Sequence, residues 1–325
     1  MEPRIQYAKT SDGVSIAFWT MGEGLPLVYM PPGIFSHIQL EWQHPSIRRW
    51  YEALANGRRL VRYDGRGTGL SQRDVASFSL DSFLADLEAV ADRLGLERFA
   101  LWGFGDSGPV AISYAARFPE RVSHLLLWCT WARTSDPPWV ETMGELMKKD
   151  WEAYTETVAH GLLGWSATEE AGWLAALIRE AVAPETALAA TSAGNELDAV
   201  GLLSSVRSPT LVLHRRQIRW PEVDVARGLG SRIPAARLAL LEGEFPVPYL
   251  GDTESVLAAI DEFLGEGEEA AAKSELPEGM AVILFADIAD STALTEQIGD
   301  AAFRAKAREL DTSLRAIIRE RGERA

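Results

Sequence analysis

The sequence has one cysteine, no long apolar run and no excess of basic residues. Cys129 is the single cysteine among 325 residues, which excludes an internal disulfide framework and suits a reducing cytoplasm. No apolar run approaches the ~20 residues that a membrane span needs, and no apolar signal-peptide core follows the N-terminal residues. The 47 acidic and 32 basic residues give a net charge of −15, which argues against nucleic acid or an anionic membrane as the main partner. We expect a cytoplasmic protein that binds neither.

Short apolar runs alternate with segments of helical periodicity. The predicted strands are Leu25–Met30, Arg59–Tyr63, Phe99–Trp102, Val122–Cys129, Thr210–His214 and Arg237–Leu241, and the main predicted helices are Leu80–Leu94, Pro109–Phe118 and Thr253–Leu264. This order indicates βαβ units, which build a mostly parallel sheet with helices on both faces. Ligands of such sheets bind beyond the carboxyl ends of the strands, so we expect Gly33, Gly105 and the segment after Cys129 to converge there.

The segment Leu101–Pro109 joins a predicted buried strand to a predicted helix through a glycine-rich turn, Gly-Phe-Gly-Asp-Ser-Gly. This turn resembles the nucleophile elbow G-x-S-x-G of the α/β-hydrolase family. On that pattern Gly105 stands at the nucleophilic serine and Ser107 at the last glycine. Glycine adopts the backbone angles of the elbow freely, whereas another residue there costs about 1–3 kcal/mol. We predict an elbow without its nucleophile, with Ser107 pointing into the packing between helix and sheet.

The resemblance extends over residues 1–265, which we expect to form an α/β-hydrolase fold. It implies an oxyanion-hole N–H in the turn after Met30, supplied by Gly33 or Ile34. The segment Asp64–Ser71 (DGRGTGLS) is close to a D-x-R-G-x-G-x-S turn of the family, in which we expect Asp64 and Arg66 to brace the loop.

Residues 130–206 contain helical stretches and no strand signal, and in the family a helical cap is inserted there. Five of the 11 tryptophans fall in this region, namely Trp131, Trp139, Trp151, Trp165 and Trp173. We interpret them as the core of the cap, with the walls of an apolar pocket as the alternative.

The other two members of a hydrolase triad are also replaced on this resemblance. Ile218 stands at the acid after the strand Thr210–His214, and Pro246 stands at the histidine ahead of the run Pro248–Asp252. Neither side chain can orient an imidazole or accept a proton. Only five histidines exist, His37, His44, His124, His160 and His214. His37 follows the oxyanion turn and is expected to reach the pocket.

An acidic, alanine- and glycine-rich stretch over residues 266–279 reads as a linker. The segment Ala281–Thr292 then resembles the opening of a class III nucleotidyl cyclase domain, whose first strand ends in F-x-D-I-x-x-S-T. The resemblance maps a metal-binding carboxylate to Asp287 and a metal-binding carbonyl to Ile288, for Mg²⁺ or Mn²⁺. Residues 280–325 would then be the first strand and helix of a ferredoxin-like cyclase domain. The alternative is a buried strand followed by a helix cap.

Three functions follow from these patterns. A capped pocket without a triad favours a sensing module, in which a small apolar molecule with a carbonyl or carboxylate regulates a cyclase that uses ATP or GTP and works as a homodimer. The alternative is an enzyme of the same fold that uses another constellation, with Asp106, His37 or Glu244 as acid or base. A dimerising scaffold is the third. The expected pocket residues are Gly33, Ile34, His37, Gly105 and Asp106. No cofactor is expected for residues 1–265.

Overall fold

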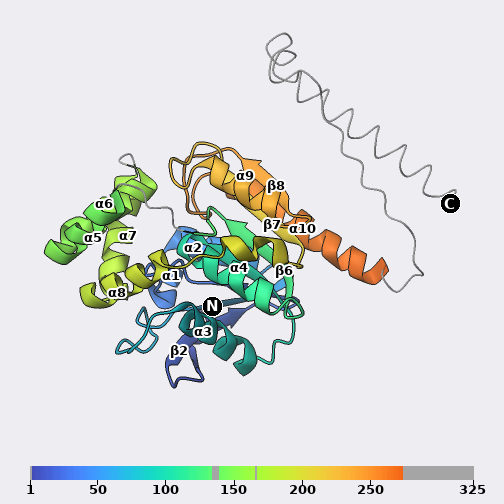
Figure 1. Cartoon of the computed structure of the whole chain (residues 1–325), viewed down its shortest axis with the longest axis horizontal. Coiled ribbons are helices and arrows are strands. Elements are labelled where there is room, and N and C mark those ends of the chain that lie inside the picture. Colours follow the sequence, from blue (N-terminus) through green and yellow to red (C-terminus); the bar gives the residue numbers. More distant parts are fainter. Residues whose placement is uncertain (1, 134–138, 165–166, 274–325) are drawn as a thin grey trace, which may run out of the picture. The chain divides into compact units, whose positions relative to one another are not determined.

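The computed structural model describes residues 2–133, 139–164 and 167–273 (Figure 1). The chain divides into two compact units, Met1–Ala271 and Ala272–Ala325, and the described residues belong almost entirely to the first. The predicted cyclase segment 280–325, with Asp287 and Ile288, lies outside the described residues.

The first unit is built on one eight-stranded sheet with the strand order β1-β2-β4-β3-β5-β6-β7-β8. The strands are β1 (Gln6–Lys9), β2 (Ser15–Met21), β3 (Leu25–Tyr29), β4 (Arg58–Tyr63), β5 (Phe99–Phe104), β6 (Val122–Trp128), β7 (Thr210–Arg215) and β8 (Arg237–Leu241). β2 pairs antiparallel with β1 and with β4, and all other neighbours are parallel. The prediction of a mostly parallel sheet is confirmed.

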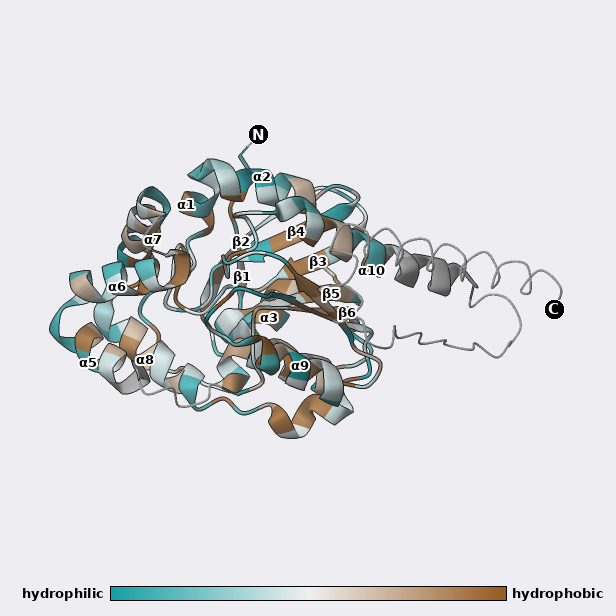
Figure 2. Cartoon of the chain, turned by 90° about the horizontal axis from the view of Figure 1, so that it is seen from above, coloured by the Kyte–Doolittle hydropathy of each residue, from teal (hydrophilic) through white to brown (hydrophobic). Residues whose placement is uncertain are grey.

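Helices cover both faces of the sheet. One face packs on α1 (Ile38–Gln43), α2 (Pro45–Leu54) and α10 (Thr253–Lys273), and the other on α3 (Leu80–Arg93), α4 (Gly108–Arg117) and α9 (Val223–Arg232). The apolar strands β3, β5 and β6 lie between these layers in Figure 2. Successive residues of a strand point to opposite faces, so Val28 and Leu101 join one core while Tyr29 and Trp102 join the other.

The inserted helices α5 (Trp139–Lys149), α6 (Trp151–Leu163), α7 (Thr168–Ala181) and α8 (Pro184–Asn195) lie between β6 and β7 in the chain. They gather in one group in Figure 1, and the apolar core that they form also includes Ile34 and Val247 from the loops at the strand ends. The N–H of Gly69 donates to Ala181 O at 2.8 Å, which ties this group, called the cap below, to the loop after β4. The expected helical cap is therefore present.

Helix α10 runs to Lys273 and so includes residues 266–273, where the sequence analysis placed a linker. Glutamate and alanine, which dominate this stretch, are strong helix formers. The composition that indicated a linker thus also supports the helix.

Candidate functional site

The turn between β5 and α4 has the geometry of an elbow. β5 ends at Phe104, Gly105–Ser107 form one turn of 3-10 helix, and α4 begins at Gly108. Gly105 has φ +53°, in the region that favours glycine. A Cβ at Gly105 would meet no atom within 4 Å. The space in front of the elbow is therefore open to a side chain that Gly105 does not supply.

Ser107 cannot take over as the nucleophile in this geometry. Its Oγ accepts from the N–H of Phe104 and donates to Phe104 O, both at 2.9 Å, and the residue is 5% exposed. The hydroxyl is thus engaged by the backbone of the turn, although Ser107 also borders the cavity at the carboxyl end of the sheet.

Ile218 and Pro246 offer no proton-transfer group near the strand ends. Ile218 is buried in the apolar core on the α2 face. The carbonyl of Pro246 accepts from Trp128 Nε1 at 2.6 Å, and Trp128 pairs with Phe104 across β5 and β6. The buried guanidinium of Arg215 donates to the carbonyls on either side, Phe245 O at 2.9 Å and Val247 O at 3.1 Å. Backbone contacts therefore occupy this part of the site.

Asp106 points into a cavity at the carboxyl end of the sheet. The cavity has a volume of about 730 Å³, which includes space open to solvent. Its lining includes Met30, Gly33, Ile34, Tyr63, Arg66, Asp86, Asp106 and Val110 from the sheet side and Ala190, Thr191 and Asn195 from cap helix α8. The side chain of Asp106 is exposed to this space, and desolvation by the protein around it raises the pKa of its carboxyl group to about 6.

The carboxyl group of Asp106 lies against the turn that was expected to form the oxyanion hole. A Cβ at Gly33, which has φ +61°, would lie 2.6 Å from Asp106 Oδ2, so only glycine leaves room there. The N–H of Gly33 donates to Pro31 O at 2.9 Å. The N–H of Ile34 has no acceptor among the described residues, which makes Ile34 the donor left for a ligand in this turn.

Burial, followed by the charge of Asp106, raises the pKa of Tyr154 in cap helix α6. Tyr154 of the cap therefore lies close enough to Asp106 for the charge of the carboxylate to affect the pKa of its phenol. None of the described cap tryptophans lines the cavity. Trp151 stacks on Tyr154, and Trp173 packs against His44 at a ring distance of 4.2 Å, which fits the interpretation of these two side chains as packing residues.

His37 lies away from this cavity. It is the N-cap of α1, where its Nδ1 accepts from the N–H of Leu40, and burial lowers the pKa of His37. It does not line the cavity around Asp106. The expectation that His37 reaches the pocket does not match this geometry, because its ring is turned back onto its own helix.

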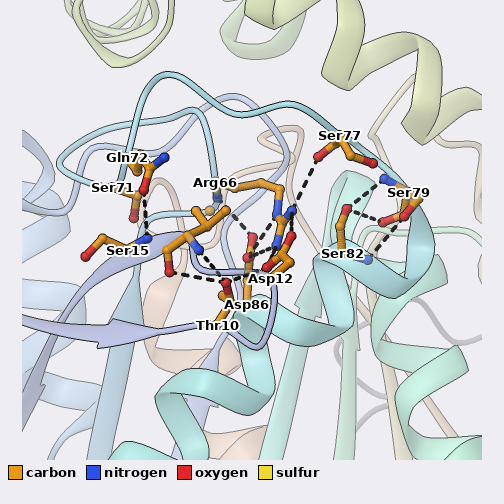
Figure 3. A network of polar contacts seen from close by, with 12 residues as sticks. Thr10, Asp12, Ser15, Arg66, Ser71, Gln72, Ser77, Ser79, Ser82 and Asp86 are labelled. Atoms are coloured by element: carbon orange, nitrogen blue, oxygen red, sulfur yellow. Dashed lines mark hydrogen bonds and ion pairs between the residues drawn. The ribbon is translucent and has the colours of Figure 1, made fainter.

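The loop after β4 is braced as the sequence analysis expected. Buried Asp64 accepts from the N–H groups of Ile38 and Leu70 at 2.9 and 2.8 Å. Arg66, whose side chain is 1% exposed, bridges Asp86 in α3 and Asp12 in the loop after β1 at 2.9 and 2.7 Å (Figure 3). Arg66 and Asp86 also line the cavity, a role that the motif alone did not reveal.

The two carboxyl groups that contact Arg66 have pKa values shifted in opposite directions. Hydrogen bonds from Arg66 and Thr10 lower the pKa of Asp12 to about 2, whereas burial raises the pKa of Asp86 to about 6 against the opposing effect of Arg66.

Among the described residues, no group of three His, Cys, Asp or Glu side chains could hold a metal ion, and no helix is long and apolar enough to cross a membrane.

A mostly parallel sheet, an elbow of strand, turn and helix, and a helical cap between β6 and β7 define a capped α/β protein of the hydrolase type. Residues 26–214 match the family model described as alpha/beta hydrolase fold. The chain belongs to this family.

Two curated relatives are similar over most of their length. The AB hydrolase superfamily protein YisY of Bacillus subtilis is 26% identical over 79% of this chain and 98% of its own. The pimeloyl-[acyl-carrier protein] methyl ester esterase of Nitrosomonas europaea is 30% identical over 65% of this chain and 86% of its own. A hydrolase structure from Pseudomonas aeruginosa covers 81% of this chain and 98% of its own with a TM-score of 0.71 and 22% identity, which supports the fold.

Restoring a serine at Gly105 is expected to yield no acyl-enzyme, because no histidine is among the described residues that line the cavity, and Ile218 and Pro246 cannot replace one. The strained φ should lower the stability by about 1–3 kcal/mol. The matched control is Gly105→Ala, which has the same strain without the hydroxyl. Stopped-flow release of p-nitrophenol from p-nitrophenyl acetate checks this, and a stoichiometric burst in Gly105→Ser alone would contradict it.

Proposed function

We propose that this chain is a hydrolase-fold enzyme that cleaves a small ester or lactone through attack by water, with Asp106 as general base. The observation that carries this proposal is the position of the Asp106 carboxyl group in the cavity, against Gly33 of the turn in which the N–H of Ile34 has no acceptor among the described residues. Relatives of this chain include proteins named as an ester esterase and as hydrolases, which supports hydrolysis as the class of reaction.

The reaction begins with Asp106 ionised. The carboxylate takes a proton from a water molecule, and the oxygen of this water adds to the carbonyl carbon of the substrate. The negative charge thereby moves from Asp106 to the substrate oxygen, which accepts from the N–H of Ile34. The first turn of a helix also leaves N–H groups without intrahelical partners, so the N–H of Asp106 is a second donor. Fixed donors of this kind stabilise the developing charge.

The second half of the reaction returns the proton. The C–O bond to the leaving group breaks, and the departing oxygen takes the proton from the Asp106 carboxyl group, which restores the carboxylate. A neutral Asp106 next to Ile34 during the intermediate avoids repulsion between two negative charges. If Asp106 stayed ionised, its charge would repel the oxyanion. Asp106 therefore takes the proton before the turn stabilises the negative charge on the substrate oxygen.

The pH profile tests this proposal. Since the base acts in its ionised form and its pKa is raised to about 6, kcat/KM for phenyl acetate and dihydrocoumarin should rise from pH 5 to 7 and then level off. No burst should precede steady turnover, and a fluorophosphonate probe should not label the protein. A burst or a labelled residue would indicate a covalent intermediate instead of direct attack by water. A rate equal to that in buffer alone at every pH would contradict the enzymatic proposal.

The sensing module is the second candidate. It is favoured by Gly105, Ile218 and Pro246, which supply neither nucleophile nor base around the elbow. In that case a small apolar carbonyl or carboxylate compound binds the cavity without turnover and influences the segment after residue 280. There Asp287 and Ile288 would hold Mg²⁺ or Mn²⁺ in a complete, homodimeric cyclase domain that uses ATP or GTP. A rise in melting temperature with a substrate that is never hydrolysed would favour this function over the enzymatic one.

A further inference from the structure

A second cavity opens on the other face of the sheet, at the same strand ends. Side chains alternate along strands, so Tyr29, Arg62 and Phe104 line this cavity, whereas their neighbours Met30, Tyr63 and, past the elbow, Asp106 line the first. Its volume is about 510 Å³, again with space open to solvent. The two linings have no residue in common.

One wall of the second cavity carries two charged side chains, Arg62 and Glu41, which are paired with each other. Arg62 Nη2 donates to Glu41 Oε1 at 2.8 Å, and its Nε donates to the hydroxyl of Tyr51 at 3.1 Å. Tyr51 in turn donates to Glu41 Oε2 at 2.6 Å. The side chains of Arg62 and Glu41 are 1% and 4% exposed. Because the buried cation and anion are paired with each other, the cavity presents no unpaired charge to a ligand from these groups.

Two phenols on the lining keep a free proton. The hydroxyl groups of Tyr29 and Tyr249 donate to no acceptor among the described residues, although Tyr29 is 3% exposed and lies stacked on Trp102. Burial raises the pKa of both phenols well above the usual range, so both remain neutral donors. Each hydroxyl can therefore donate a hydrogen bond to an acceptor that enters the cavity.

The remaining walls are apolar and come from the sheet and the cap. Phe104 faces this space from the end of β5, Phe35 and Val247 face it from loops, and Leu174 and Leu177 face it from cap helix α7. Concave sites with mainly apolar walls and a few directed polar groups are typical of small-molecule binding.

We propose that this second cavity binds a neutral, largely apolar small molecule with a carbonyl oxygen that accepts from Tyr29 or Tyr249. The paired Arg62 and Glu41 disfavour a charged ligand, the cap leucines favour a hydrocarbon body, and the two phenols select an acceptor. This site goes beyond the proposed hydrolysis, which uses Asp106 and Ile34 in the first cavity.

Three probes with the same bicyclic body test the proposal on the full chain: 2-tetralone, tetralin and tetralin-2-carboxylate, titrated calorimetrically at pH 7.5. 2-Tetralone should bind most tightly and the carboxylate most weakly. Tyr29→Phe or Tyr249→Phe should weaken 2-tetralone binding by about 2–10-fold and leave tetralin binding unchanged, since each variant removes one hydrogen bond and no volume. Leu174→Trp, which fills the cavity, should remove binding of both.

Tyr114→Phe is the matched control, because Tyr114 is a buried tyrosine outside the cavity whose hydroxyl also lacks a partner. It should bind 2-tetralone as the parent chain does. Equal binding of ketone and carboxylate, or unchanged ketone binding in both cavity tyrosine variants, would overturn the proposal. Loss of ketone binding in Asp106→Asn alone would place the probe in the first cavity and overturn it as well. Failure of ester hydrolysis would leave all these binding results standing.

Discussion

Replacement of Asp106 by asparagine is expected to lower kcat/KM for phenyl acetate and dihydrocoumarin by about 10²–10⁴-fold, the usual contribution of a general base. Asparagine keeps the shape of the side chain and the backbone N–H groups at the elbow, so KM should change much less than kcat. The inflection of the rate near pH 6 should disappear with the carboxyl group. Steady-state kinetics from pH 5 to 8 measures both effects.

The same variant carries a stability signature with a defined sign. The pKa of Asp106 is raised from 3.8 to about 6 in the folded chain, so the folded state binds a proton more tightly than the unfolded state. The contribution of this carboxyl group to the free energy of unfolding therefore falls as the pH rises from about 4 to 6. Above this window the folded state holds the carboxylate in its disfavoured, ionised form. Asp106→Asn should raise the melting temperature at pH 8 and change it little below pH 4.

The exposed Asp74 provides a surface control, since Asp74→Asn should alter neither rate nor melting temperature. An Asp106→Asn protein with full activity would show that another group takes the proton. A protein with less activity and a lower melting temperature at pH 8 would indicate a structural role for the carboxyl group instead.

Much of the scaffold could be predicted because its signals are local. The apolar run ahead of Gly103 and the glycine at position 105 predict a strand and a turn with positive φ from residue types alone. Asp64 and Arg66 were expected to brace their loop, and a motif of fixed spacing suffices for this. Helix α3 begins and ends close to the predicted bounds, because Ser79 caps it and Gly95 follows it.

The cavities could not be predicted because they depend on distant packing. Whether Tyr29 or Met30 faces a given cavity follows from the register of β3 in the sheet and from the position of the cap. His37 lies close in sequence to the oxyanion turn, yet the helix that it caps turns its ring away. The pairing of Arg62 with Glu41 joins a strand to a helix that precedes it, and no motif announces this contact.

Removal of the Arg66 side chain is expected to give the largest loss of stability, about 3–5 kcal/mol for Arg66→Ala, the usual cost of leaving one member of a buried ion pair alone. Asp86 is 2% exposed and would lose the two hydrogen bonds from the Arg66 side chain, while the backbone N–H of residue 66 would still donate to it. Urea unfolding at pH 8 measures the loss.

The two partners of Arg66 should differ in importance. Asp12 has a side chain that is 45% exposed, so Asp12→Asn should cost no more than about 1 kcal/mol, as is usual for surface ion pairs. The loss in Arg66→Ala should also shrink toward pH 5, because the raised pKa of Asp86 allows this carboxyl group to become neutral once its partner is gone. Equal losses in Asp12→Asn and Arg66→Ala would locate the stabilising contact at the surface. A much larger loss in Arg66→Ala would locate this contact in the interior, at Asp86. Since Arg66 and Asp86 line the first cavity, the ion pair that braces the loop would then also fix the cavity wall opposite cap helix α8.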